Sequence, residues 1–138
     1  MQNEKWITTN ITGSKQLIDW FGCWPSFHDA EVIEVNLTRK GTSWLKIHTW
    51  RMTSAVDPSG RYVLDKHVVV TFKLEDVQGL NLIGFNQQNV IFGLSIAPTE
   101  SGIEIGLADC FGISGELVAS QVAIEITPGN PKDQCSDG

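Results

Sequence analysis

An alternation of apolar and polar residues runs through most of the chain after Gly22, and it constrains the fold more than any other feature. From residue 33 to residue 37 the apolar side chains fall on the odd positions, and the same period of two returns in later segments. This period puts one face of a strand in the core and the other in solvent. The gaps between segments are too short for the crossovers that parallel strands require. The sequence therefore predicts an antiparallel sheet of six or seven strands.

One amphipathic helix is predicted ahead of the sheet, over residues 13–22. Leu17 and Phe21 recur at helical spacing, Ser14 is placed to cap the N-terminus, and Gly22 supplies a stop. Because one helix can cover only part of the apolar face, the sheet must curl strongly or close in part. The predicted fold class is α+β, with a mainly antiparallel, strongly curled sheet and one N-terminal helix.

A long hairpin is predicted around residues 57–60, where proline is preset for a tight bend and glycine is free to close it. Its arms contain residues 44–50 and 68–74. Residues 80–83, which follow Gly79, are expected to form a separate short strand. Later strands are predicted at 90–96, 103–107 and 116–126.

The 138 residues are expected to form a single domain, 1–138, with an ordered core at about 6–128 and a polar tail at 129–138. No apolar run approaches the roughly 20 residues that span a bilayer. The first residues lack the basic and apolar regions of a secretory signal. The expected location is the cytoplasm, with no membrane partner.

The charge balance is acidic, with 10 Lys and Arg against 16 Asp and Glu, and a net charge of −6. Such a field repels nucleic acid, because phosphate binding rests on Lys and Arg. It favours a basic protein partner and raises the rate of encounter with one. Solubility alone is the simpler explanation of the same charge.

Residues 24–32 carry two large aromatics, a proline and three ionisable side chains where the helix gives way to the first strand. His28 and Asp29 could form a general-base pair, but adjacent residues on a strand point to opposite faces. An Asp in a turn more often bonds nearby backbone amides. An enzyme would need His28, Asp29 and Glu31 to converge in one cleft. We expect a structural or docking role for Asp29 and predict no catalytic residue.

Metal and thiol chemistry have little support in the sequence. His48 and His67 fall on the polar faces of adjacent predicted strands and could meet across the hairpin, but no metal-binding spacing accompanies them. Cys23, Cys110 and Cys135 form no C-x-x-C pair. Cys23 and Cys110 adjoin aromatic residues, where free thiols commonly act as small hydrophobes. Neither a metal site nor a cofactor is predicted.

All five tryptophans lie within the first 50 residues. Trp20 and Trp24 are expected in the core. Trp44 and Trp50 share the face opposite Leu45, so neighbouring elements cover them or they form an aromatic surface that faces a partner. They are the candidate partner-facing aromatics of the chain.

The run at residues 21–32 reads F-G-x-W-P-S-F-H-D-A-E-V, and it resembles the signature of the immunity protein 50 family. Members of this family are predicted antidotes in bacterial polymorphic toxin systems. A second run, G-F-N-x-x-N-V-I at residues 84–91, fits the same family, and the likeness extends from about residue 17 to residue 128. The residues that carry it are Trp24, Pro25, Ser26, Phe27, His28, Asp29, Glu31, Asn86 and Asn89.

The resemblance implies a non-enzymatic cytoplasmic protein that binds and neutralises a cognate toxin domain, for which a basic nuclease is one candidate. It brings no catalytic residues. The residues that carry it either contact the toxin or hold the corner between helix and strand. The protein is expected to be a monomer or a homodimer that pairs through an edge strand. The alternative function is a small-ligand binding module with an aromatic-lined pocket in the curled sheet.

Overall fold

The structure, a computed structural model, describes residues 3–131 and confirms an α+β fold with a curled antiparallel sheet. The elements in chain order are α1 (Glu4–Asn10), α2 (Ser14–Phe21), β1 (Glu31–Asn36), β2 (Thr42–Val56), β3 (Tyr62–Ile83), β4 (Val90–Pro98), β5 (Ile103–Phe111) and β6 (Ser114–Pro128). Within residues 3–131, neither helix combines the length and the hydrophobicity that crossing a membrane requires.

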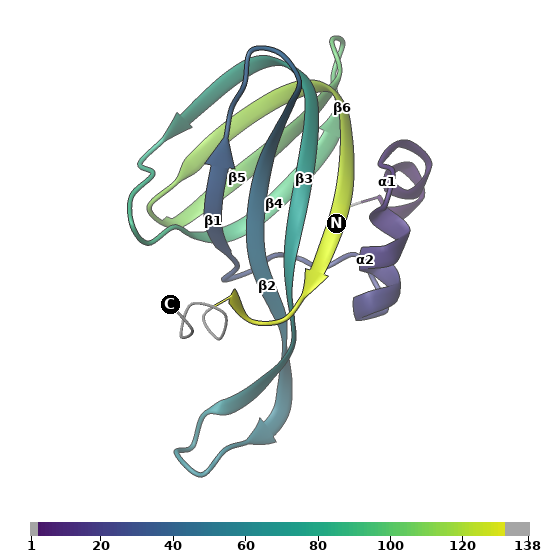
Figure 1. Ribbon diagram of the computed structural model, residues 1–138. Helices are drawn as coiled ribbons and strands as arrows, with labels where there is room; N and C mark the ends of the chain where they lie inside the picture. The colour runs from purple at the N-terminus through teal and green to yellow at the C-terminus, as the bar shows by residue number, and fades with distance from the viewer. Residues whose placement is uncertain (1–2, 132–138) are drawn as a thin grey trace.

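The six strands close into a barrel in the order β1-β2-β3-β6-β5-β4 (Figure 1). Every neighbouring pair is antiparallel, as the short connections predicted. The sheet is therefore curled so strongly that β1 pairs with β4, where Glu31 lies opposite Val90. Because the barrel is closed, the apolar face of each strand is buried against the strands on the opposite side of the barrel.

The inside of the barrel is filled by alternate side chains of the strands. Leu45 lies opposite Phe72, and Ile47 lies opposite Val70; all four are fully buried. Filling of this kind gives a small barrel a packed interior. The alternative function required an aromatic-lined cavity in this place, and the observed packing occupies that space.

Two helices precede the sheet, and the single predicted helix corresponds to α2. The first helix, α1, has seven residues and one buried side chain, Ile7, so it shows no periodic stripe. It begins where the Asn3 side chain accepts a hydrogen bond from the Trp6 amide at 3.2 Å. The expected cap of α2 was wrong, because Gly13 is the N-cap and the Ser14 hydroxyl instead donates to the Ile7 carbonyl at 3.2 Å.

The helices cover a side of β6 that no strand pairs. Pairing with β5 ends at Ala119, so residues 120–128 have β3 on one side only. There the Ile124 amide donates to the Thr12 carbonyl at 2.7 Å, and both helices lie beside β6 (Figure 1). Gly13 is so close that a Cβ would lie 2.0 Å from the Ile124 carbonyl oxygen. The absence of a side chain at residue 13 thus lets the helical segment dock.

The return strand of the hairpin is continuous, so residues 80–83 are the end of β3 and not a separate strand. The register shifts between Val77 and Gly79, which marks a bulge. A glycine inside an alternating pattern can signal either a break or a bulge. The sequence did not distinguish the two.

The β2–β3 hairpin continues past the barrel as a two-stranded extension, here called the arm and defined as residues 50–66 (Figure 1). It turns at the predicted residues 57–60, where the Gly60 amide donates to the Asp57 carbonyl at 3.0 Å. Where the arm leaves the barrel, the register shifts between Thr49 and Arg51, and Lys66 has a left-handed φ of 53°. Bulges of this kind bend a hairpin and increase its twist.

The two glycines that flank α2 provide a matched test of helix docking. Gly13 and Gly22 have nearly the same φ, +86° and +85°, but a Cβ at Gly22 would meet nothing within 4 Å. Gly22→Ala should lower the free energy of unfolding by about 1–2 kcal/mol, the cost of a left-handed alanine. Gly13→Ala should lower it by roughly 3 kcal/mol or more, because strain and a backbone clash add. Urea denaturation measures both; equal losses would contradict the docking contact.

Candidate functional site

Two aromatic residues of the segment 24–31 belong to the core. Trp24 is 8% exposed and Phe27 is 1% exposed. The ring centroid of Phe27 lies 5.8 Å from that of Trp24 and 5.9 Å from that of Phe72. Phe27 adopts a φ of 61°, which is rare for an aromatic residue, and its burial holds it there. The expectation of a buried Trp24 is confirmed.

The polar residues of the same segment form a turn against β4. The Ser26 hydroxyl accepts from the His28 amide at 3.2 Å, and His28 Nδ1 lies 3.0 Å from the Phe92 carbonyl oxygen. Asp29 has a φ of 64°, and its amide donates to the Ile91 carbonyl at 3.0 Å. Its carboxylate approaches His28 Nε2 at 3.5 Å. The backbone of Asp29, and not its carboxylate as expected, therefore fixes the path of the chain.

Asn89 is the central residue of the second run and is 3% exposed. Its side-chain oxygen accepts from the amides of Asn86 at 2.9 Å and Ile113 at 3.2 Å. Its side-chain nitrogen donates to the Asn86 carbonyl at 2.6 Å. The Asn86 side chain in turn accepts from the Gln88 amide at 2.8 Å. Asn89 thus links the β3–β4 loop to the start of β6.

The two runs meet at the junction of β1 and β4, here called the seam. The Val32 amide donates to the Asn89 carbonyl at 2.8 Å, and the Ile91 amide donates to the Ala30 carbonyl at 2.9 Å. Glu31, half-buried, pairs with Val90 between these bonds. Four of the residues that carry the family resemblance, His28, Asp29, Glu31 and Asn89, therefore take part in the contacts that close the barrel.

The three candidate acid–base residues do not converge in one cleft. His28 faces Phe92, with ring centroids 5.1 Å apart, and borders the hollow beside Trp24. Glu31 instead borders a different pocket, together with His48. This arrangement does not assemble the trio that an enzyme mechanism would require.

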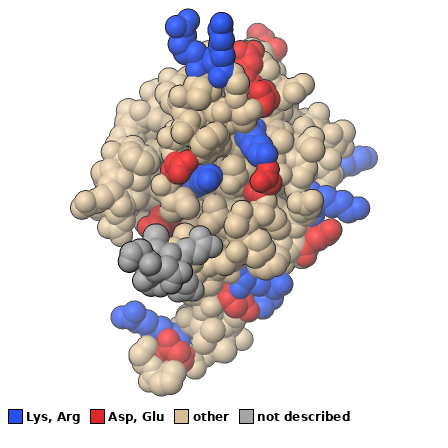
Figure 2. Space-filling view, in the orientation of Figure 1, with Lys and Arg blue, Asp and Glu red and all other residues tan. Residues whose placement is uncertain are grey.

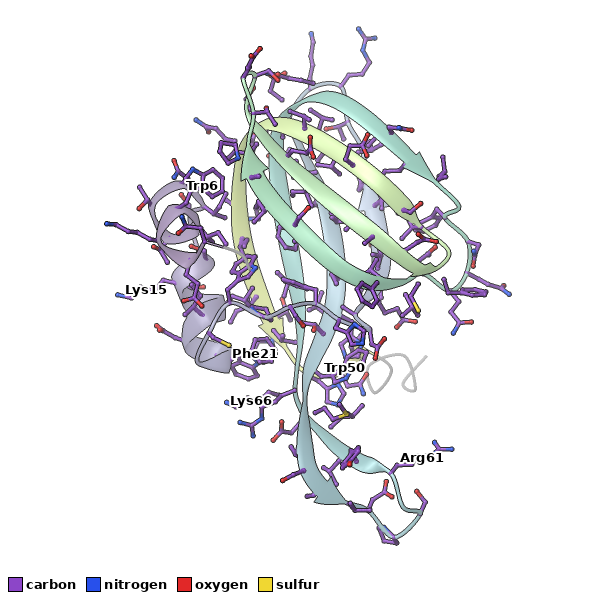
Figure 3. All side chains as sticks on the ribbon, turned by 180° about the vertical axis from the view of Figure 1, so that it is seen from behind. Trp6, Lys15, Phe21, Trp50, Arg61 and Lys66 are labelled. Atoms are coloured by element: carbon purple, nitrogen blue, oxygen red, sulfur yellow. The ribbon has the colours of Figure 1, made fainter. Side chains whose placement is uncertain are left out.

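The two candidate partner-facing tryptophans have different surroundings. Trp44 is half-buried, its indole N–H donates to the Glu34 carboxylate, and Lys46 Nζ lies 5.8 Å from its ring centroid. Trp50 lies six residues further along β2, or about 20 Å at the usual rise of a strand. It stands at the base of the arm (Figure 3). Trp50 packs on His48 and borders the same pocket as Glu31, at the base of a projecting hairpin, so it is the stronger candidate for partner contact.

The arm presents exposed apolar side chains at its cross-strand positions. Met52 lies opposite Leu64, and Val56 lies opposite Tyr62. Their exposed fractions are 65% for Met52, 41% for Leu64, 58% for Val56 and 58% for Tyr62. Exposed apolar residues scattered singly are ordinary, but paired ones on a projecting ribbon mark an interaction surface. The sequence carries only a weak signal for them, because Ser54 interrupts the alternation between Met52 and Val56.

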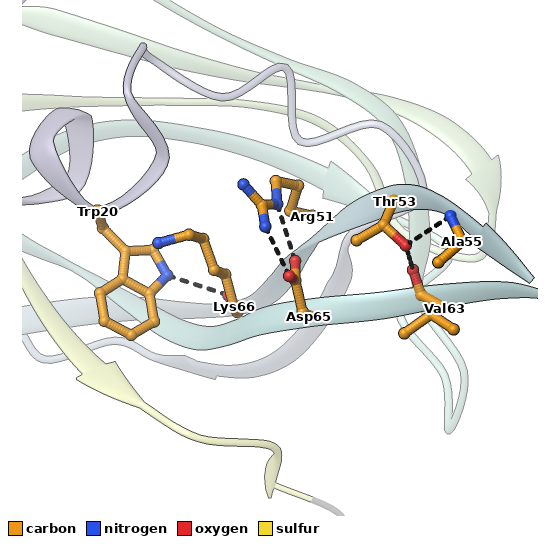
Figure 4. A network of polar contacts seen from close by, with 7 residues as sticks. All are labelled: Trp20, Arg51, Thr53, Ala55, Val63, Asp65 and Lys66. Atoms are coloured by element: carbon orange, nitrogen blue, oxygen red, sulfur yellow. Dashed lines mark hydrogen bonds and ion pairs between the residues drawn. The ribbon is translucent and has the colours of Figure 1, made fainter.

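Polar contacts join the two strands of the arm to each other and to the body of the protein (Figure 4). Arg51 donates to both carboxylate oxygens of Asp65, at 2.9 and 2.6 Å, and the Thr53 hydroxyl donates to the Val63 carbonyl at 2.8 Å. The hydrogen bond from Arg51 lowers the pKa of the Asp65 carboxyl. From α2, the half-buried Trp20 donates its indole N–H to the Lys66 carbonyl at 3.0 Å. The arm is therefore braced by the body of the protein.

A pocket of about 290 Å³ opens at the base of the arm, and we call it the basal pocket. Its lining residues are Asp29, Glu31, His48, Trp50, Leu64, His67, Gln88, Val90 and Asn130. His48 Nε2 lies 3.0 Å from His67 Nδ1, which confirms that the two histidines meet across the hairpin. In residues 3–131, no group of three or more His, Cys, Asp or Glu side chains has an arrangement that could hold a metal ion.

Charge and thiols are distributed over the surface. Acidic and basic side chains are interspersed on the face that Figure 2 shows. Cys23 and Cys110 are free and exposed, so their expected role as small hydrophobes was wrong. Cys135 and most of the polar tail lie outside the described residues.

Comparison with known proteins gives one family. A family model described as Immunity protein 50 matches residues 13–129. No curated protein and no solved structure matches the chain.

The role of Asn89 at the seam is testable by substitution. Asn89→Ala should lower the free energy of unfolding by about 2–4 kcal/mol, because it removes side-chain hydrogen bonds and leaves buried amides without partners. Gln87→Ala, in the same loop but exposed, should change it by less than about 0.5 kcal/mol. Urea denaturation measures both. An Asn89→Ala protein as stable as the Gln87→Ala protein would contradict a structural role.

The arm should loosen in acid. Because Arg51 lowers the pKa of Asp65 below its unfolded value of about 3.9, the pair stabilises the arm above that pH. This stabilisation is lost as the pH falls through the folded pKa of Asp65. Amide protection in residues 51–65, compared with residues 68–74, should therefore drop on acidification. Asp65→Asn should weaken the amide protection of residues 51–65 already at pH 7, and acidification should then change it less than in the wild-type protein. If this variant loses as much protection in acid as the wild-type protein does, the Arg51–Asp65 pair is not the cause.

Proposed function

Because the chain belongs to the immunity protein 50 family, we propose that it binds a cognate toxin domain and neutralises it without catalysing a reaction. Neutralisation takes place in the cytoplasm, before the toxin reaches its target. Binding covers the toxin by steric occlusion, so this protein needs no active site of its own. A basic nuclease is a candidate toxin, since an acidic protein of net charge −6 is attracted to a basic surface.

The observation that carries this proposal is the arm. It projects from the barrel and exposes Met52, Val56, Tyr62 and Leu64 to solvent. A monomeric protein gains no stability from apolar side chains held out in water, whereas a binding surface needs them. The bracing of the arm by Arg51 and Trp20 lowers the conformational entropy that binding would otherwise cost.

The arm and the adjoining barrel surface offer enough area for a tight complex. A standard interface buries about 800 Å² per partner, and a few central side chains carry most of its free energy. Tyr62 and Trp50 belong to the residue types that dominate such centres. The surrounding charges raise the rate of encounter, while the apolar contacts slow dissociation.

Co-expression with the toxin domain encoded by the neighbouring gene tests the function. The protein should restore growth and co-purify with the toxin. Met52→Ser combined with Leu64→Ser should raise the Kd of the complex at least about tenfold, because both exposed apolar side chains of one cross-strand pair are lost. Leu80→Ser combined with Ile83→Ser is the matched control, since these residues are 46% and 66% exposed on the same strand away from the arm.

The variants should keep the wild-type Tm, because all four residues are exposed. No rescue and no complex with the wild-type protein would sink the proposed function. A complex that tolerates the arm variant and is weakened by the control variant would place the toxin on another surface.

A further inference from the structure

The basal pocket joins residues that lie far apart in the sequence. Asp29 and Glu31 come from the segment that leads into β1, Trp50 from β2, and Leu64 and His67 from β3. Leu64 also belongs to the apolar pair of the arm. The pocket and the arm therefore form one continuous surface.

An aromatic group forms the wall of the pocket. The ring centroid of His48 lies 4.9 Å from that of Trp50 and 5.2 Å from that of His67. His48 is 3% exposed, and its Nε2 is within hydrogen-bond distance of His67 Nδ1. Such a bond needs one nitrogen without a proton, so the intact pair carries at most one positive charge. The wall is rigid and does not strongly repel a cation.

Asp29 and Glu31 each place a carboxylate at the border of the same pocket, and the carboxylate of Asp29 lies 3.5 Å from His28 Nε2. Within residues 3–131, neither Asp29 nor Glu31 has a Lys or Arg nitrogen within 4.0 Å. The basic residues at the base of the arm are engaged elsewhere. Arg51 is paired with Asp65, and Lys66 Nζ lies 5.1 Å from the ring centroid of Trp20. The pocket thus combines two carboxylates with an aromatic ring, and its lining residues include no Lys or Arg.

The size of the pocket selects the kind of occupant. Small-molecule sites usually have volumes of about 300–1,000 Å³. At about 290 Å³, the basal pocket lies at the lower limit of this range, and a volume of this size has room for a single side chain. A planar guanidinium stacks on an aromatic ring and donates two parallel hydrogen bonds to a carboxylate, which an ammonium group does less well.

We propose that the basal pocket receives an arginine side chain of the toxin domain while the apolar face of the arm packs beside it. This inference rests on the proposed function and adds the chemistry of the contact. The guanidinium lies against Trp50 and is bonded by Asp29 and Glu31. The methylene stem of the arginine continues over Leu64 toward the arm, where apolar toxin residues meet Met52.

The test is the affinity of the purified complex between the full chain and the toxin domain of the neighbouring gene. The test variant is Asp29→Asn combined with Glu31→Gln. Asn tolerates the left-handed backbone of residue 29, and Gln keeps the size of Glu, so the fold is preserved. The matched control is Glu100→Gln combined with Glu104→Gln, at and after the β4–β5 turn, which removes the same two charges. The test variant should raise Kd at least about tenfold, and the control should raise it less than about threefold.

A double-mutant cycle identifies the partner group. Each exposed Arg and Lys of the toxin is changed to Met, and each change is measured against wild-type protein and the test variant. For one arginine, the change to Met should weaken binding to the wild-type protein at least about tenfold. The same change should have little effect on binding to the test variant. Changing that arginine to Lys should recover only part of the affinity, because the planar contacts are lost.

The outcomes separate the two proposals. An unchanged Kd for the test variant, in a complex that the arm variant weakens, overturns the pocket and leaves the function standing. Equal weakening by the test variant and the control variant shows general electrostatic attraction and overturns the proposal that the pocket binds an arginine. The same proposal is overturned if no toxin arginine is coupled to the test variant. A wild-type protein that forms no complex overturns both proposals. A free protein that dimerises through the arm, seen as a dimer that Met52→Ser with Leu64→Ser dissociates, assigns this surface to a second copy instead.

Discussion

The barrel depends on the seam, where β1 and β4 join through few contacts. Glu31 pairs with Val90, and a small set of backbone bonds flanks this pair. A sheet loses its free edges only when its first and last strands meet. This short junction therefore decides whether the structure is a barrel or an open sheet. Next to this junction, the side chain of Asn89 makes hydrogen bonds to Asn86 and Ile113, and the ring of Phe27 packs against Phe72 in the core.

Closure also determines where the arm stands. β2 and β3 have 15 and 22 residues, whereas β1 has six, so the hairpin must project past the end of the barrel. It leaves at the end where Glu31 lies opposite His48, beside the seam. The residues before β1 consequently border the basal pocket while their backbones close the barrel. In the segment 24–31, backbone bonds therefore help to close the barrel, and the toxin contact that we propose involves the side chains of Asp29 and Glu31.

Sequence reasoning reached the strands because alternation is a local signal. It missed α1, whose seven residues bury only Ile7, and it read Gly79 as a break because a bulge has the same sequence signal. Barrel closure was expected only in part, since alternation does not state which distant strands pair. The basal pocket was out of reach for the same reason: Asp29, Trp50 and His67 become neighbours only through the register of β1, β2 and β3.

A two-stranded ribbon is marginally stable by itself in water. This arm is held because its strands continue into the barrel, and because Trp20 of α2 bonds the carbonyl of Lys66 where the strands leave it. The apolar residues on the ribbon can therefore stay exposed without collapsing onto the body. The bond from Trp20 braces the base of the arm, so in the complex that we propose the partner group in the basal pocket sets the geometry. Contacts further along the arm then add area, and a partner without a group for the pocket forms those contacts in poorer register.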